Sequence, residues 1–92
     1  MTVQVLRLYI AGHTPAADRA IHNLERIVLD IGCEDLQLEI IDILEHPQVA
    51  EDERILATPV VIKKLPPPVR RVVGDLCERE KVLVGLELRE IR

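Results

Sequence analysis

The chain is predicted to form a single α/β domain, and three observations lead to this prediction. First, 92 residues with 48% apolar composition can build one small hydrophobic core. Second, the N-terminal half shows a strand pattern, a helix pattern and another strand pattern with short connections between them. Third, no internal repeat, low-complexity segment or flexible linker divides the chain. We therefore treat residues 1–92 as one domain.

The first predicted element is a strand over residues 3–10. This segment is rich in β-branched and aliphatic residues. Leu6, Leu8 and Ile10 lie on one face of the strand, and Arg7 interrupts the other. The pattern indicates a strand with one strongly apolar face.

The second predicted element is a helix that begins at Pro15. Thr14 is a good N-cap, and Pro15 takes the first helical position, where its missing N–H costs nothing. Gly32 is placed to end the helix. Apolar residues recur at spacings of three and four, at Ala17, Ala20, Ile21, Leu24, Ile27, Val28 and Ile31.

Residues 36–44 are predicted to form the next strand. Little alternation follows Ile40, which is typical of a strand covered on both faces. Strand, helix and strand with short connections predict a right-handed βαβ unit with parallel strands over residues 1–46.

The remaining residues, 47–92, give conflicting signals. Pro47 could begin a helix or lie in a loop. Residues 69–76 carry a full helical stripe of apolar residues, yet residues 70–76 also fit a strand. Residues 82–88 alternate like a half-buried strand, although the same stretch offers a helical face. One interpretation is that this half has two packings of similar free energy.

Composition excludes several classes of function. The net charge of −4 and a single aromatic residue, Tyr9, argue against a nucleic-acid binder. No apolar run approaches the roughly 18 residues of a membrane span. The N-terminus lacks the basic start and apolar stretch of a secretion signal, so the cytoplasm is the expected location.

Charge is segregated along the chain. From Asp30 to Glu53 there are nine acidic residues and no Lys or Arg. From Arg54 to Gly74 there are five basic residues and no acid. The pattern fits two solvated surfaces and equally fits an acidic flank and a basic edge that orient a protein partner.

No constellation typical of catalysis or of a cofactor is apparent. The histidines and cysteines have no familiar metal-ligand spacing, so no metal site is expected. The turn at 12–15 lacks the second Gly and the Lys-Ser/Thr pair of a phosphate loop, so no nucleotide cofactor is expected either. Without a Ser/His/Asp set or a carboxylate pair, the chain is not expected to be an enzyme.

The βαβ unit, followed by Ala57-Thr58-Pro59 and the β-branched Val60–Ile62, resembles the thioredoxin-like fold. In that fold a cis proline precedes the third strand, and Pro59 stands at the matching position. The dithiol motif is absent, because Ala11–Ala16 occupies its place without a cysteine. A thiol function of Cys33 or Cys77 is the alternative that this fold leaves open.

A more specific resemblance covers nearly the whole chain in register. It identifies the sequence as similar to the KaiB family of the cyanobacterial circadian clock, which has relatives in other bacteria. The matching segments are Leu6–Pro15, Ile40–Asp42, Pro47–Glu51, Ile55–Pro59, Leu65–Arg71, Gly74–Leu76 and Arg79–Leu86.

The resemblance implies a non-enzymatic regulator that exchanges between two folds. The resting form is βαββααβ and self-associates as a tetramer or dimer. The active form is a monomer with the thioredoxin-like order βαβαββα. Residues 1–46 stay constant and residues 47–92 refold. The resting form is the one expected in the structure, because high concentration favours self-association.

The resemblance also implies partners. The active form docks on the N-terminal ATPase ring of a KaiC-type protein, whose phosphorylation state it modulates. It helps to sequester KaiA and competes with a SasA-type histidine kinase. The alternative is a stress-related binding protein that keeps the fold but has no clock role.

Two sets of residues are matched to the family. Arg54, Lys63, Arg70 and Arg71 are expected to contact the partner. The positions expected to govern the exchange of folds are Pro59, Pro66, Pro67, Pro68, Gly85 and Glu87. The prolines are included because X-Pro isomerisation can gate exchange. Gly85→Ala is expected to favour the thioredoxin-like form, since Gly costs a helix up to about 1 kcal/mol relative to Ala.

Overall fold

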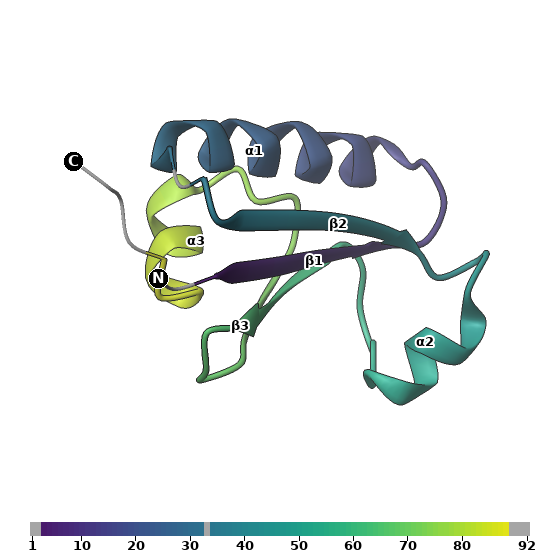
Figure 1. The fold of residues 1–92 in the computed structure, drawn as a ribbon. Coiled ribbons are helices and arrows are strands. Elements are labelled where there is room, and N and C mark those ends of the chain that lie inside the picture. Colours follow the sequence, from purple (N-terminus) through teal and green to yellow (C-terminus); the bar gives the residue numbers. More distant parts are fainter. Residues whose placement is uncertain (1–2, 33, 89–92) are drawn as a thin grey trace.

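Four strands and three helices follow the order β1-α1-β2-α2-β3-β4-α3 in the computed structural model, which describes residues 3–32 and 34–88. The strands are β1 (Gln4–Ile10), β2 (Leu36–Asp42), β3 (Val60–Leu65) and β4 (Arg70–Val73), and the helices are α1 (Pro15–Ile31), α2 (Pro47–Asp52) and α3 (Arg79–Gly85). The strands form one mixed sheet in the order β2-β1-β3-β4. Helices α1 and α3 pack on one face, and α2 lies against the other (Figure 1).

The predicted βαβ unit is confirmed. β1 and β2 pair in parallel, with Leu6 opposite Leu38. The Oγ1 atom of Thr14 accepts a hydrogen bond from the backbone N–H of Ala17 at 3.0 Å, as an N-cap should. Gly32 ends α1 with a φ of 67°, a left-handed conformation that glycine adopts at little cost.

The expectation that β2 is covered on both faces is wrong. β2 is an edge strand of the sheet, and 42% of Ile40 is exposed. The apolar run at its end instead reflects Ile41 and Ile43, which pack toward α2 at that end of the sheet. A local pattern could not separate this partial cover from full burial.

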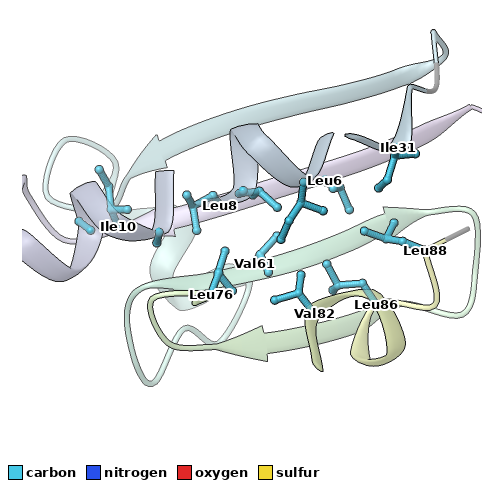
Figure 2. Packing of buried hydrophobic residues seen from close by; sticks show 13 residues of the cluster. Leu6, Leu8, Ile10, Ile31, Val61, Leu76, Val82, Leu86 and Leu88 are labelled. Carbon is cyan, nitrogen blue, oxygen red and sulfur yellow. The ribbon is translucent and has the colours of Figure 1, made fainter. Parts of the chain in front are cut away.

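The core lies on both faces of the sheet. Successive residues of β1 point to opposite faces, so Leu8 joins the main core and Tyr9 joins a smaller one with Val60 and Ile62. Each fully buried large aliphatic side chain contributes about 2 kcal/mol. The main core unites both halves of the chain (Figure 2) and comprises Leu6, Leu8, Ile10, Ala17, Ala20, Leu24, Ile27, Ile31, Val61, Leu76, Val82, Leu86 and Leu88.

The structure resolves the conflicting signals of residues 47–88. A short helix, α2, begins at Pro47. Residues 70–73 form strand β4, antiparallel to β3, and residues 79–85 form helix α3. The element order is therefore βαβαββα, the thioredoxin-like arrangement, and the expectation of the resting form βαββααβ is not met. That expectation depended on self-association, a stabilisation that a single chain does not have.

Left-handed backbone at residues other than glycine is concentrated in the second half. Among the described residues, the non-glycine positions with positive φ are Arg54 at 53°, Leu76 at 63° and Glu87 at 54°. Each lies at a connection next to α2 or α3. Such a conformation is uncommon for any residue other than glycine, asparagine or aspartate and costs of order 1 kcal/mol or more. This arrangement of residues 47–88 therefore carries local strain.

Candidate functional site

The four basic residues expected to contact a partner lie at or near the β3–β4 side of the sheet. β4 is an edge strand, and its residue Arg70 pairs with Lys63 of β3 while Arg71 pairs with Ile62. Because side chains alternate along a strand, the first pair lies on the face of α1 and α3 and the second on the face of α2. The structure therefore divides the predicted set between two faces.

On the α3 face, Glu87 brings Lys63 and Arg70 together. Its Oε2 atom lies 3.6 Å from Arg70 Nε and 4.0 Å from Lys63 Nζ. Only 2% of Lys63 is exposed, so its ammonium group is enclosed below Glu87 rather than presented at the surface. Arg70 stays half exposed. One charged cluster therefore contains Lys63 and Arg70, which were expected to contact the partner, and Glu87, which was expected to govern the exchange of folds.

On the α2 face, Arg71 fastens the end of α2 to the hairpin. Its guanidinium donates to the backbone carbonyl of Glu53 at 2.6 Å and to that of Arg54 at 3.2 Å. Lys64 forms an ion pair with the carboxylate of Glu53. Sequence reasoning missed this pair, although Glu53 ends the acidic stretch and Lys64 belongs to the basic stretch. The Arg54 side chain is exposed and, within the described residues, has no carboxylate within ion-pair distance.

The four prolines expected to govern refolding are placed around β3. Pro59 is buried directly before β3, and the Thr58–Pro59 bond is cis, as the resemblance to the thioredoxin-like fold predicts. Pro66, Pro67 and Pro68 form the turn between β3 and β4. The structure brings none of these prolines into the charged cluster around Glu87.

Gly85, the last residue of α3, packs closely on β4. A Cβ atom added there would lie 2.7 Å from Cγ2 of Val72. Real Cβ contacts are longer, so any larger residue at this position requires Val72 or the strand to shift. Glycine at 85 therefore allows α3 to approach β4, a reason that helix propensity alone does not reveal.

The described thiol, Cys77, lies beside a carboxylate that disfavours its ionisation. It is exposed and unpaired. A hydrogen bond between the thiol and the Asp75 carboxylate raises the pKa of Cys77, so little thiolate forms near neutral pH. The loop after β1, where a dithiol motif would lie, contains Gly12 and His13 instead. Cys33, the other candidate thiol, lies outside the described residues.

A carboxylate ties together two loops of the N-terminal half. Asp42 Oδ1 accepts hydrogen bonds from the backbone N–H of Leu44 at 2.9 Å and of Gly12 at 3.1 Å. These two bonds, the first being the stronger cause, lower the pKa of Asp42. The contact fixes the β1–α1 loop against the turn after β2.

Two searches of the described part of the chain bear on other classes of site. No helix within residues 3–32 or 34–88 has the length and apolarity needed to cross a membrane. In the same residues, no three His, Cys, Asp or Glu side chains gather as metal ligands would.

The fold and the loop after β1 define a class, a thioredoxin-like domain with Gly12 and His13 where a dithiol motif would lie. Solved structures agree on the fold. The N-terminal domain of SasA from Synechococcus elongatus aligns with all of this chain and 90% of its own, with a TM-score of 0.76 and 20% identity. Mitochondrial thioredoxin 3 from Saccharomyces cerevisiae aligns with 91% of this chain and 76% of its own, with a TM-score of 0.73 and 13% identity.

Sequence comparison narrows the class to one family. The KaiB domain model matches residues 7–88. The circadian clock oscillator protein KaiB of Rippkaea orientalis is 52% identical over 84 residues, which cover 91% of this chain and 81% of that protein. KaiB of Prochlorococcus marinus subsp. pastoris is 51% identical over the same length, with 78% of that protein covered. The chain belongs to the KaiB family.

Proposed function

We propose that this chain is a non-enzymatic clock regulator that switches fold and binds the N-terminal ATPase ring of a KaiC-type protein. In this proposal, binding modulates the phosphorylation state of that protein, and the chain acts in the cytoplasm. The thioredoxin-like arrangement described above is the binding form, and a self-associated βαββααβ arrangement is the resting form. The observation that carries the proposal is identity above 50% to KaiB clock proteins across 91% of the chain.

The distribution of backbone strain supports two forms. The described non-glycine residues with positive φ all fall within residues 47–88, the half proposed to refold. Residues 3–32 and 34–46, proposed to stay constant, contain positive φ only at glycines. This conformational cost falls on the thioredoxin-like packing of residues 47–88. It therefore reduces the free-energy difference between that packing and any second packing of the same residues that avoids the cost. A partner that binds only one form then shifts the population by its differential affinity.

The proposed contact surface follows from the placement of the basic residues. Arg54, Arg70 and Arg71 carry exposed positive charge and contact acidic groups of the KaiC-type ring. Lys63 is enclosed beneath Glu87, so its proposed role is to hold Glu87 and Arg70 in place. Electrostatic complementarity of this kind sets the rate and register of association. KaiA and a SasA-type kinase are the further proposed partners, one sequestered and the other displaced.

The SasA domain gives independent support for competition. It shares the thioredoxin-like fold across the whole length of this chain. Two proteins of one fold can occupy the same docking surface on a common partner. Because the identity is 20%, this similarity supports a competitor with the same fold and carries no argument about its individual contacts.

The test is binding to the isolated N-terminal ring of a KaiC-type ATPase. We expect Arg54→Ala and Arg70→Ala each to weaken binding about tenfold, since charged contacts of this kind are worth about 1–2 kcal/mol. Arg26→Ala, an exposed arginine on α1 outside the proposed surface, is the matched control and should bind like the unmodified chain. Failure of the unmodified chain to bind the ring, or equal binding by all three variants, contradicts the proposal.

A further inference from the structure

Three side chains fasten the β4–α3 connection to helix α1. Asp75 Oδ2 accepts a hydrogen bond from Arg19 Nε at 3.2 Å, and the backbone carbonyl of Asp75 accepts one from Asn23 Nδ2 at 2.9 Å. Asp75 Oδ1 also accepts from the backbone N–H of Cys77 at 3.2 Å. We call Arg19, Asn23 and Asp75 the α1 latch.

The latch holds a connection whose backbone is unfavourable. Leu76 follows Asp75 with a φ of 63°, and only 5% of this residue is exposed. Its side chain belongs to the main core, as does that of Leu24 of α1. Figure 2 shows Leu76 in this core together with Val82 of α3. A bulky residue persists in the left-handed region only where its surroundings over-determine it. Burial of Leu76 on one side and the latch on the other provide that constraint.

The latch joins the two halves that the proposed function distinguishes. Arg19 and Asn23 lie in the half that stays constant, and Asp75 lies in the half that refolds. The sequence around Leu76 also fits a helix over residues 69–76, and a helix needs φ near −63°. In such a helix the positive φ of Leu76 is lost, so Asp75 cannot keep its present relation to α1. The latch contacts are therefore incompatible with a helix over residues 69–76.

We infer that Arg19 and Asn23 are positioning residues that select the thioredoxin-like form by holding Asp75. This inference rests on the proposed function, because a selector acts only where two forms exchange. Neither residue needs to touch the partner. Their effect on binding is exerted through the fraction of chains that already have the competent arrangement.

The experiment measures populations in the free chain and affinity for the KaiC-type ring. Asn23→Asp keeps the size of the side chain but replaces its N–H donor with a carboxylate that faces a carbonyl. Arg19→Ala removes the other contact, and Arg19→Lys keeps a donor as the conservative variant. Arg26→Ala, on the same helix, is the matched control. Dispersed amide signals and the helical circular dichroism signal establish that each variant is folded.

We expect Asn23→Asp and Arg19→Ala to lower the ratio of the thioredoxin-like to the resting form by about three- to tenfold in ¹⁵N amide spectra. Where the competent form is the minor one, the affinity for the ring should fall by the same factor, because the apparent Kd scales inversely with the competent fraction. Arg19→Lys should lie between Arg19→Ala and the unmodified chain, and Arg26→Ala should match the latter.

Two outcomes overturn the inference, and they are distinguishable. If the unmodified chain shows a single form and no binding to the ring, the proposed function and the latch fail together. If the unmodified chain exchanges and binds but the Asn23 and Arg19 variants keep its populations, only the latch fails. The second outcome includes a loss of affinity with unchanged populations, because the residues would then act as direct contacts.

Discussion

The Asp75 carboxylate shifts the pKa of the Cys77 thiol in the direction opposite to that found in redox enzymes. In a dithiol enzyme a helix N-terminus or a cation lowers the thiol pKa, but here the Asp75 carboxylate raises that of Cys77. The same carboxylate has its own pKa lowered by Cys77 and by Arg19. Charge at this position is therefore arranged to hold Asp75 ionised and Cys77 protonated.

Asp75→Asn should make Cys77 more reactive. Without the carboxylate, the thiol loses the interaction that disfavours its thiolate, so its pKa falls toward the ordinary value and alkylation by iodoacetamide at pH 7.5 becomes faster. The measurement uses a Cys33→Ser background, so that one thiol is followed. Glu80→Gln, which removes a carboxylate elsewhere on α3, is the control. An unchanged alkylation rate in Asp75→Asn would show that Asp75 does not control the thiol.

The same arrangement predicts the outcome for the thiol alternative. Addition of the protein to insulin and dithiothreitol should not accelerate insulin reduction, because the pKa of Cys77, the thiol among the described residues, is raised by Asp75. Thioredoxin in the same assay serves as the positive control. Acceleration that survives in Cys77→Ser would assign activity to Cys33, and acceleration lost in that variant would assign it to Cys77.

Individual residues were predictable where their roles are local. Thr14 and Gly32 were placed correctly as helix caps, and Pro15 as the first helical residue, because these signals depend on a few consecutive residues. The enclosure of Lys63 was not predictable, because Glu87 reaches it only after α3 has packed on the sheet. The role of Arg71 at the end of α2 likewise depends on the pairing of β3 with β4.

Helix α3 and strand β4 are coupled by one close approach. Gly85 permits the contact with Val72 that a Cβ atom would obstruct at 2.7 Å. Helix propensity favours alanine by up to about 1 kcal/mol, but Gly85 is the last residue of α3, where less of that gain applies. The two effects oppose each other, so the gain expected from Gly85→Ala is smaller than propensity suggests.

A double-mutant cycle on Gly85→Ala and Val72→Ala measures this conflict. We expect a favourable coupling of about 1 kcal/mol in the free energy of unfolding, because Val72→Ala removes the methyl group that alanine at 85 meets. The control cycle pairs Gly85→Ala with Val84→Ala, since 77% of Val84 is exposed, and should show no coupling. Additive effects in the first cycle would mean that β4 moves aside freely.

The elements of the first half were predicted uniquely, whereas most of those of the second half were left between two alternatives, for a physical reason. Residues 3–44 show one periodicity at a time, and caps mark where it changes. Residues 69–88 satisfy helix and strand periodicities together, so the choice depends on partners across the sheet. Residues 70–73 form strand β4 because they pair with β3. Residues 79–85 form helix α3 because this conformation buries Val82, and the following Leu86, in the main core.

Stability of the folded chain should fall in acid. The pKa of Asp42 and that of Asp75 are lower in the folded chain than in the unfolded one, through backbone donors for Asp42 and through Cys77 and Arg19 for Asp75. The unfolded state therefore binds more protons in acid. The stabilisation is fully present above the unfolded pKa near 4 and is lost as pH falls through the folded values.

Urea unfolding between pH 7 and pH 3 checks this expectation. Asp42→Asn should flatten the acid limb of the stability profile, because the substituted residue no longer gains a proton on unfolding. Glu45→Gln, a nearby exposed carboxylate with no tertiary hydrogen bond among the described residues, should leave the limb unchanged. A full acid limb in Asp42→Asn would assign the effect to other carboxylates.

The division of Arg70 and Arg71 between opposite faces of an edge strand constrains how any large ligand can approach. A flat surface laid on one side of the sheet meets the face to which Arg70 belongs, and one laid on the other side meets the face to which Arg71 belongs. Engagement of both requires a cleft or a protruding pair of loops that straddles the rim of the sheet. A binding partner that uses both arginines must therefore approach the β4 edge of the sheet and contact both of its faces.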